Sequence, residues 1–201
     1  KRSFLSDYTV KVINNGIDLS VFKPTESTFR EKYDLQNKYM VLGVASPWGE
    51  RKGLDVFTEL SKRLDDRYRI VLVGLSKEQK ENLPPNIIGL ERTANQTELV
   101  EIYTAADVFA NPTREDNFPT VNIEALACGT PVVTFNTGGS AEMLDKNCGS
   151  SVNCDDIDAF EKEIWNICEN KPYSIENCLK RAEQFDMNNK FEEYVKVYGQ
   201  Y

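Results

Sequence analysis

The sequence has 201 residues, of which 40% are hydrophobic and 28% are charged, a globular composition that excludes a wholly disordered or collagen-like chain. It carries 24 Lys and Arg against 32 Asp and Glu, and the resulting net charge of −8 excludes a general binder of nucleic acids or anionic membranes. The chain has no histidine, which excludes a Ser-His or Cys-His nucleophile pair and any histidine-ligated metal site.

Five short apolar runs are continuously hydrophobic rather than alternating, which is typical of strands buried on both faces of a parallel sheet. Segments with helical spacing separate them, and Asn95 with Glu98 indicates the N-terminal cap of one helix. The pattern predicts one α/β domain, a Rossmann-like parallel sheet with helices on both faces. The predicted strands are residues 39–44, 69–74, 86–89, 107–110 and 131–135, and the predicted helices are residues 54–64, 96–105 and 120–127.

After residue 152 we predict no further strand, only a helical C-terminal tail. Its last apolar stripe, Phe191, Tyr194, Val195 and Tyr198, follows the i, i+3, i+4, i+7 spacing of one helix face. This helix packs either on the domain's own sheet or on a surface outside this chain.

The five cysteines are odd in number and form no Cys-x-x-Cys pair, so we predict neither a disulfide framework nor a zinc site. Such usage fits a reducing compartment, the cytoplasm. No apolar run reaches the length of a membrane span, and the first residues do not resemble a signal peptide. Because the first residue is Lys1 and not a methionine, we expect a fragment or a processed piece.

Ligands of parallel sheets bind outside the carboxyl ends of the strands, so the loops after the strands are the candidate sites. After the first strand, Arg51 and Lys52 stand at a helix start, where the helix dipole disfavours cations. A bound phosphate would explain them, because the unpaired N–H groups there favour an anion. The alternative is a solvated basic pair neutralised by Glu50.

Two later loops also carry candidate residues. The loop after the fourth strand leads through Pro119 into a helix where Glu124 stands among apolar residues, as an acceptor for two ligand hydroxyls or as an exposed side chain. After the fifth strand, Gly138 and Gly139 open a further predicted helix before Glu142, either to approach a phosphate or as an ordinary turn. Neither a Gly-x-Gly-x-x-Gly nor a P-loop motif occurs.

The segment from Asp116 to Val133, which reads DNFPTVNIEALACGTPVV, resembles the signature of the GT4 family of glycosyltransferases: two acids with seven residues between them, followed by an Ala-Cys-Gly-Thr-Pro-Val-Val run. The resemblance implies one half of a GT-B fold, the C-terminal domain that binds the nucleotide-sugar donor. Shorter matches follow in family order: Asn15-Gly16-Ile17-Asp18 with Phe22, Lys52-Gly53, Ala106-Asp107-Val108, and Thr137-Gly138-Gly139 with Glu142.

The resemblance implies roles for individual residues. Asp116 would lie beside the transferred sugar and Lys52 would offset charge on the leaving diphosphate, so these two are the implied catalytic residues. Glu124 would accept hydrogen bonds from the ribose hydroxyls. The other implied donor-binding residues are Arg51, Gly43, Ile88 in the loop that holds the base, the helix start Asn117, Phe118, Pro119 and Thr120, and the pair Gly138 and Gly139.

The implied reaction moves a sugar from a UDP- or GDP-linked donor to an acceptor hydroxyl with retention, with no cofactor and no metal ion required. Departure of a diphosphate needs preorganised positive charge and amide dipoles rather than a histidine. The sequence departs from the family pattern in three places, one of which is Asn14, where proline is frequent. Asp116 stands where glutamate is usual, and Gly43-Val44-Ala45-Ser46 lacks the usual arginine, which leaves open whether Arg51 replaces it.

The resemblance also implies the domain boundaries. Residues 1–11 would be the tail of a missing N-terminal domain or a linker, residues 12–185 the nucleotide-sugar-binding domain, and residues 186–201 a helix that crosses back to the missing domain. That domain would bind a glycan or glycolipid acceptor, in the cytoplasm or at the membrane periphery. We therefore expect this chain alone to bind nucleotide and to transfer little or no sugar, and exposed tyrosines on the last helix would support this view.

Three alternatives stay open at this point. The chain could be a non-catalytic nucleotide-binding module, or part of a sugar-nucleotide epimerase that uses the same GT-B fold. A flavodoxin-like receiver-type domain is the structural alternative for the strand and helix pattern.

Overall fold

The computed structural model describes residues 10–199, so the expected tail over residues 1–9 and the last two residues lie outside the described part. Six strands form one sheet in which every neighbouring pair is parallel, in the order β3-β2-β1-β4-β5-β6. This confirms the Rossmann-like prediction, and the order differs from that of a flavodoxin-like sheet. The strands are β1 (Tyr39–Val44), β2 (Tyr68–Val73), β3 (Ile87–Leu90), β4 (Val108–Asn111), β5 (Val132–Phe135) and β6 (Gly149–Val152).

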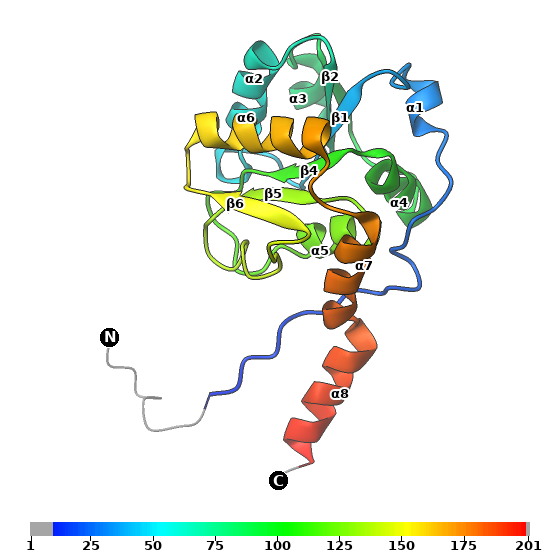
Figure 1. Cartoon of the computed structure of the whole chain (residues 1–201), viewed down its shortest axis with the longest axis vertical. Helices are drawn as coiled ribbons and strands as arrows, with labels where there is room; N and C mark the ends of the chain where they lie inside the picture. Colours follow the sequence, from blue (N-terminus) through cyan, green and yellow to red (C-terminus); the bar gives the residue numbers. More distant parts are fainter. Residues whose placement is uncertain (1–9, 200–201) are drawn as a thin grey trace.

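Helices cover both faces of the sheet (Figure 1). One core cluster joins the sheet to α1 (Phe29–Lys32), α4 (Gln96–Ala105), α5 (Thr120–Ala127) and α7 (Ile175–Ala182). The other joins it to α2 (Leu54–Arg63) and α6 (Ile157–Trp165). The short α3 (Lys77–Glu81) connects β2 to β3.

The central strands match the predictions to within a residue or two. Every residue of β4 and β5 is buried, which is the environment that their apolar runs predict. The predicted cap of α4 is also confirmed, since the Asn95 side chain accepts a hydrogen bond from the Glu98 amide at 2.9 Å. The edge strand β6 was not predicted, because its sequence Gly-Ser-Ser-Val carries no apolar run. A side chain at Gly149 would lie 2.3 Å from the Val132 carbonyl oxygen, so this glycine lets β6 pair closely with β5.

The C-terminal tail is helical, as predicted, and its last helix α8 (Met187–Tyr198) extends away from the sheet (Figure 1). Ile17 pairs with the backbone on both sides of Asp186, accepting from the Met187 amide and donating to the Phe185 carbonyl, each at 2.9 Å. The chain entering the domain therefore lies beside the start of α8.

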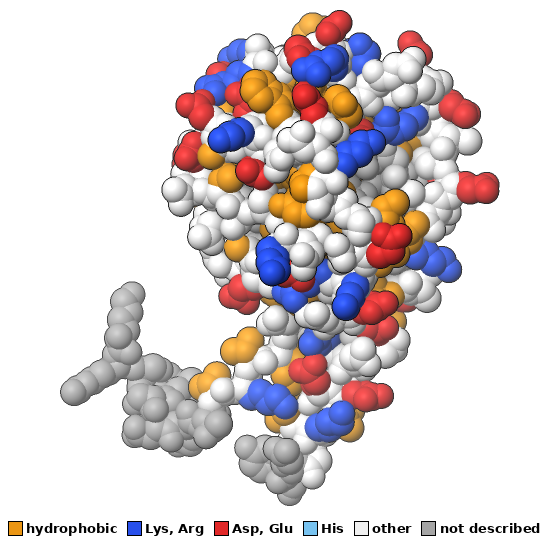
Figure 2. Space-filling model, in the orientation of Figure 1, with side chains coloured by type: hydrophobic (Ala, Val, Ile, Leu, Met, Phe, Trp, Pro, Cys, Tyr) orange, Lys and Arg blue, Asp and Glu red, His pale blue; other side chains and the backbone are white. Residues whose placement is uncertain are grey.

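The apolar stripe of α8 faces solvent. Phe191, Tyr194, Val195 and Tyr198 are 60%, 41%, 69% and 78% exposed, and α8 has no buried residue between Met187 and Tyr198. Packing of this stripe on the domain's own sheet, one of the two predicted arrangements, is therefore wrong. On the face of the molecule shown in Figure 2, acidic and basic side chains are intermixed rather than gathered into a basic surface.

Candidate functional site

The order in which the chain adds strands to the sheet reverses between β1 and β4. From β1 the chain continues outward to β2 and β3, and from β4 it continues the other way to β5 and β6. The loops after these two strands lead to helices in different core clusters, α2 and α5, and the carboxyl ends of strands at such a switch point form the crevice where open α/β sheets bind ligands. One loop covers residues 45–53 and includes the helical turn η1 (Glu50–Lys52), and the other covers residues 112–119.

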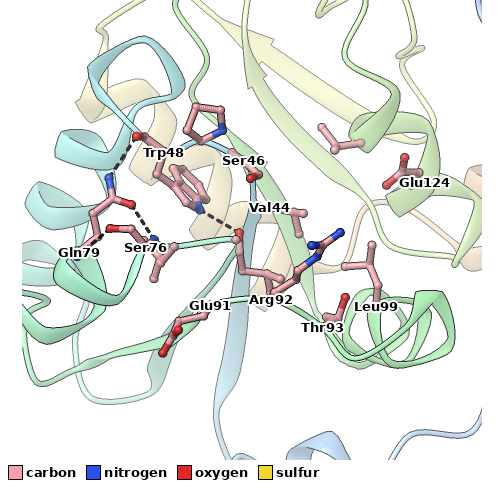
Figure 3. A pocket seen from close by; sticks show the side chains of 16 residues that line it. Val44, Ser46, Trp48, Ser76, Gln79, Glu91, Arg92, Thr93, Leu99 and Glu124 are labelled. Atoms are coloured by element: carbon pink, nitrogen blue, oxygen red, sulfur yellow. Dashed lines mark hydrogen bonds between the residues drawn. The ribbon is translucent and has the colours of Figure 1, made fainter.

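A cavity of about 810 Å³ opens at the carboxyl ends of β1, β2 and β3 (Figure 3). Its volume lies in the range of small-molecule sites. The first turns after β1 and β2 line it on one side, and Leu99 of α4 with Val121 and Glu124 of α5 line it on the other. The segment from Glu91 to Thr93, directly after β3, completes the wall.

Hydrogen bonds fix the wall formed by the loops after β1 and β2 (Figure 3). The Trp48 indole N–H donates to the Val73 carbonyl at 2.8 Å, and the Gln79 amide group donates to the Trp48 carbonyl at 3.1 Å. Gln79 and Ser76 also cap the start of α3 reciprocally. Two side chains thus hold these loops together before any ligand binds.

Glu124 lies on α5 at the edge of this cavity and is partly buried. The hydroxyl of the fully buried Tyr103 donates to its Oε2 atom at 3.0 Å. Burial raises the pKa of the Glu124 carboxyl, and hydrogen bonds with Tyr103 and Thr120 partly offset that rise. The expectation of an exposed glutamate is therefore wrong, and the carboxylate is oriented toward a space large enough for a ligand.

Lys52 and Asp116, from the loops after β1 and β4, contact each other and lie outside the cavity lining. The Lys52 Nζ atom lies 2.5 Å from Asp116 Oδ2, and both side chains are mostly shielded from solvent. The alternative in which Glu50 neutralises Lys52 is therefore wrong. The structure thus brings together two side chains that are 64 positions apart in the sequence.

The start of α5 follows the loop that carries Asp116. Pro119 occupies the capping position and no side chain caps the helix. The Asn122 amide donates to the Pro119 carbonyl at 3.0 Å, so the amides of the first two helical residues, Thr120 and Val121, are open to an anion. Asn117 is exposed, whereas the Phe118 ring packs on Phe185 at 5.9 Å between ring centroids. Thr120 is the first helical residue and lies one turn before Glu124.

Gly138 and Gly139 lie in a turn and not at the start of a helix, which corrects the prediction of a helix before Glu142. A Cβ atom would lie 2.0 Å from the Asp116 carbonyl oxygen at Gly138, and 2.1 Å from that of Asn117 at Gly139. Gly138 also has a positive φ of 49°. These glycines let the turn after β5 lie directly against the loop that carries Asp116.

Two of the implied donor-binding residues lie inside strands and outside the cavity lining. A side chain at Gly43 would collide with Phe57 and Leu72 in the core, so packing explains this glycine. Ile88 packs against the core from β3. Arg51, also outside the cavity lining, donates from its guanidinium to the Glu115 carbonyl at 3.1 Å.

Two residues of the site were not found in the sequence. Arg92 lines the cavity directly after β3 (Figure 3), and the rule that identified the other loops could have found it. Tyr103 carried no separate signal, because its spacing in α4 is that of an ordinary core residue.

Three further observations concern metal sites, membrane-spanning helices and the cysteines. Within residues 10–199 no group of three or more His, Cys, Asp and Glu side chains is placed to hold a metal ion. No helix in the same range is long and apolar enough to cross a membrane. All five cysteines are free thiols, and Cys154 is the exposed one among them.

The sequence of this chain is similar to the sequences of known glycosyltransferases. A family model described as glycosyl transferases group 1 matches residues 25–190. A D-inositol 3-phosphate glycosyltransferase of Mycobacterium sp. (strain JLS) is 26% identical over 180 residues, which cover 83% of this chain and 41% of that protein. The chain thus spans less than half the length of this relative.

Solved structures share the fold. Anabaena Alr3699/HepE in complex with UDP-glucose matches with a TM-score of 0.83 at 20% identity, over 95% of this chain and 57% of that one. The C-terminal domain of a glycosyl transferase group 1 family protein (LpcC) from Francisella tularensis matches with a TM-score of 0.68 at 20% identity, over 84% of this chain and 97% of that one. The second match shows that this fold occurs as a separately crystallised domain.

Proposed function

The chain belongs to the family of glycosyl transferases group 1, and we propose that it is the donor-binding domain of a transferase that uses a nucleoside diphosphate sugar. The observation that carries this proposal is the crevice at the switch point of the sheet. Glu124 lines the cavity there, and Lys52 contacts Asp116 between the loops after β1 and β4. The start of α5, which has no side-chain cap, lies between Asp116 and Glu124 in the chain. A sugar nucleotide needs these same groups: acceptors for a diol and donors for a diphosphate.

The donor would lie along this crevice with its nucleoside in the cavity, its diphosphate at the start of α5 and its sugar at the far end. The nucleoside enters the cavity, where the Glu124 carboxylate accepts hydrogen bonds from the two ribose hydroxyls. The diphosphate lies at the start of α5, where the amides of Asn117 and Thr120 and the Lys52 ammonium stabilise its charge. Pro119 has no N–H, and the Phe118 amide donates to Asp116 Oδ1 at 3.2 Å. The sugar then lies beside Asp116. We propose a UDP-linked donor first, because Anabaena Alr3699/HepE was crystallised with UDP-glucose.

The chemistry follows from this arrangement. The bond between the sugar and the diphosphate breaks as negative charge develops on the departing phosphate oxygen. Lys52 and the amide dipoles of α5 oppose that charge from fixed positions, so little reorganisation is needed as the bond breaks. We propose that the acceptor oxygen bonds to the anomeric carbon as the bond from that carbon to the diphosphate breaks, with retention of configuration, and that the acceptor proton passes to the departing phosphate oxygen. The proposal needs neither a metal ion nor another cofactor.

The acceptor would be bound elsewhere, on an N-terminal domain contributed by a longer protein. We propose that residues 12–185 form the donor domain, with residues 1–11 leading into it and residues 186–201 crossing back to the acceptor domain. The exposed stripe on α8 supports this division, because four large apolar side chains on one helix face favour a partner surface. The acceptor would be a glycan or glycolipid. The free cysteines favour a cytoplasmic location.

Calorimetric titration tests the proposal. UDP, GDP, ADP and their common sugar conjugates are titrated into this chain and into its Glu124→Ala variant. We expect saturable binding of one nucleotide by the wild type, weakened at least about tenfold in the variant because two hydrogen bonds to a charged group are lost. Glu101→Ala is the matched control, since Glu101 lies on α4 outside the cavity.

The outcomes separate the alternatives. Equal loss of binding in both variants would contradict the role of Glu124. If neither the folded chain nor the full-length protein binds any nucleotide, the proposed donor site is contradicted. Product analysis with the full-length protein then separates sugar transfer from epimerisation and from binding without turnover.

A further inference from the structure

Arg114, which lines no part of the cavity, joins three loops at the carboxyl edge of the sheet. It belongs to the loop after β4, and its side chain is 23% exposed. Its Nη1 and Nη2 atoms donate to the Asp55 carboxylate at 2.9 and 2.7 Å, and its Nε atom donates to Asp155 at 2.7 Å. Nη1 also donates to the Glu50 carbonyl.

Two of the three residues that accept hydrogen bonds from the Arg114 side chain, Glu50 and Asp55, lie on either side of Lys52 in the chain. Glu50 begins the turn η1 that ends at Lys52, and Asp55 lies in the first turn of α2. The planar guanidinium therefore grips the segment before and after Lys52 at fixed angles, which a lysine ammonium could not do. The Arg114 hydrogen bond lowers the pKa of the Asp55 carboxyl, so this carboxylate stays ionised as the partner of Arg114.

Backbone contacts connect the same two loops. The Arg114 amide donates to the Arg51 carbonyl at 2.9 Å, and the Arg51 guanidinium donates to the Glu115 carbonyl at 3.1 Å. At Gly53, where φ is +75°, a Cβ atom would lie 2.4 Å from the Pro112 carbonyl oxygen. The loop of Lys52 thus lies against the loop of Asp116 with no space for an additional methyl group.

We propose that Arg114 is a positioning residue that holds the loop of Lys52 against the loop of Asp116 and so fixes the contact between these two side chains. This inference rests on the proposed function, in which both side chains act on the donor. Arg114 itself touches neither the cavity nor the proposed path of the diphosphate. It acts through the segment from Glu50 to Asp55, to which it donates hydrogen bonds on both sides of Lys52.

A double-mutant cycle tests the positioning without any nucleotide. Lys52→Met, Asp116→Asn and the double variant are unfolded with denaturant, first in the wild type and then in an Arg114→Met background. We expect the Lys52–Asp116 coupling to change the unfolding equilibrium constant about fivefold in the wild type and less than about 1.5-fold in the Arg114→Met background. Persistence of the full coupling in that background overturns the proposal.

Two further variants keep the cycle decisive. Arg67→Met is the matched control, because Arg67 also pairs with two carboxylates, Asp65 and Glu169, but at the other end of the sheet. The coupling should survive in that background. If Arg114→Met does not fold, Asp55→Asn removes one anchor of the same guanidinium, and the coupling is measured in that background with the same two outcomes.

Transfer kinetics of the full-length protein give a second readout. Arg114→Lys should lower kcat about tenfold and leave the affinity for uridine, which lacks the diphosphate, within about twofold, because it displaces Lys52 and leaves the nucleoside cavity intact. A loss of affinity with unchanged kcat would overturn the assigned role. Failure of the wild type to bind any nucleotide would contradict the proposed function and leave the result of the cycle standing.

Discussion

At the scale of single residues, the proposed site depends on charged groups that are partly buried, where the loss of hydration disfavours a charge. Glu124 is partly buried against the fully buried Tyr103, and the Lys52–Asp116 pair is largely shielded from water. A side chain that lowers stability in this way persists when function requires it. Burial raises the pKa of the Glu124 carboxyl because it disfavours the carboxylate.

Replacing the charge of Glu124 should therefore stabilise the fold and abolish nucleotide binding. The raised pKa in the folded state means that stability is greatest while the carboxyl is protonated and is lost as the pH rises through that pKa. In Glu124→Gln this loss disappears, so the variant should unfold at higher denaturant concentration than the wild type at pH 7. The difference should shrink toward about pH 4, below which glutamate is protonated in both states.

Denaturant titrations between pH 4 and pH 8 measure this difference, with Glu101→Gln as the control on α4. A stabilisation of equal size at both ends of that range would contradict ionisation of Glu124 as its cause. Equal stabilisation by the control would assign the effect to net charge instead.

The Tyr103 hydroxyl should be needed both for stability and for the nucleotide site. Tyr103→Phe removes the donor to Glu124 and should lower the free energy of unfolding by about 1–3 kcal/mol, because a buried charged acceptor loses its partner. It should also weaken nucleotide binding, since Glu124 loses its orientation. Tyr68→Phe makes the same chemical change at another tyrosine–glutamate pair, the 2.6 Å contact with Glu169. That control should lose stability and keep its affinity.

At the scale of elements, the sequence predicted what periodicity and turn chemistry determine. Continuously apolar runs predicted the five strands β1 to β5, and the Asn95 cap predicted the start of α4. The strand β6 was missed because pairing with β5, and not its own composition, makes it a strand. The helix expected at Gly138 is a turn because contact with the loop of Asp116, which no local pattern records, determines its shape.

Gly138 and Gly49 offer a matched test of that contact. Gly138→Ala places a methyl group 2.0 Å from the Asp116 carbonyl oxygen at a positive φ, and should lower the free energy of unfolding by about 2–3 kcal/mol. At Gly49 the backbone is extended and no atom lies within 4 Å of the added methyl, so Gly49→Ala should change stability by less than about 0.5 kcal/mol. Chemical denaturation of both variants measures the difference, and similar values would mean that the two loops do not touch in solution.

At the scale of the whole molecule, the resemblance to GT4 assigned Lys52, Asp116 and Glu124 to one site although they come from separate loops and a helix. Spacing along the chain cannot show the contact between Lys52 and Asp116, because their loops meet only once β1 and β4 lie side by side at the switch point. The same limit explains Gly43 and Ile88, which stand near the site in sequence but face the core. Arg92 and Tyr103 entered the site through the folded arrangement alone.

The stripe on α8 gives the prediction for the whole protein. Phe191 and Val195 are 60% and 69% exposed, so Phe191→Gln combined with Val195→Gln should change the unfolding free energy of this chain by less than about 0.5 kcal/mol. In the full-length protein the same pair should lower the melting temperature and the transfer rate, because the polar amides enter the proposed domain interface. Thermal melts of both forms measure this, with the exposed polar Asn189→Ser on the same helix as the control. A loss of stability in this chain alone would mean that the stripe packs on its own domain, and unchanged behaviour of the full-length protein would remove α8 from the interface.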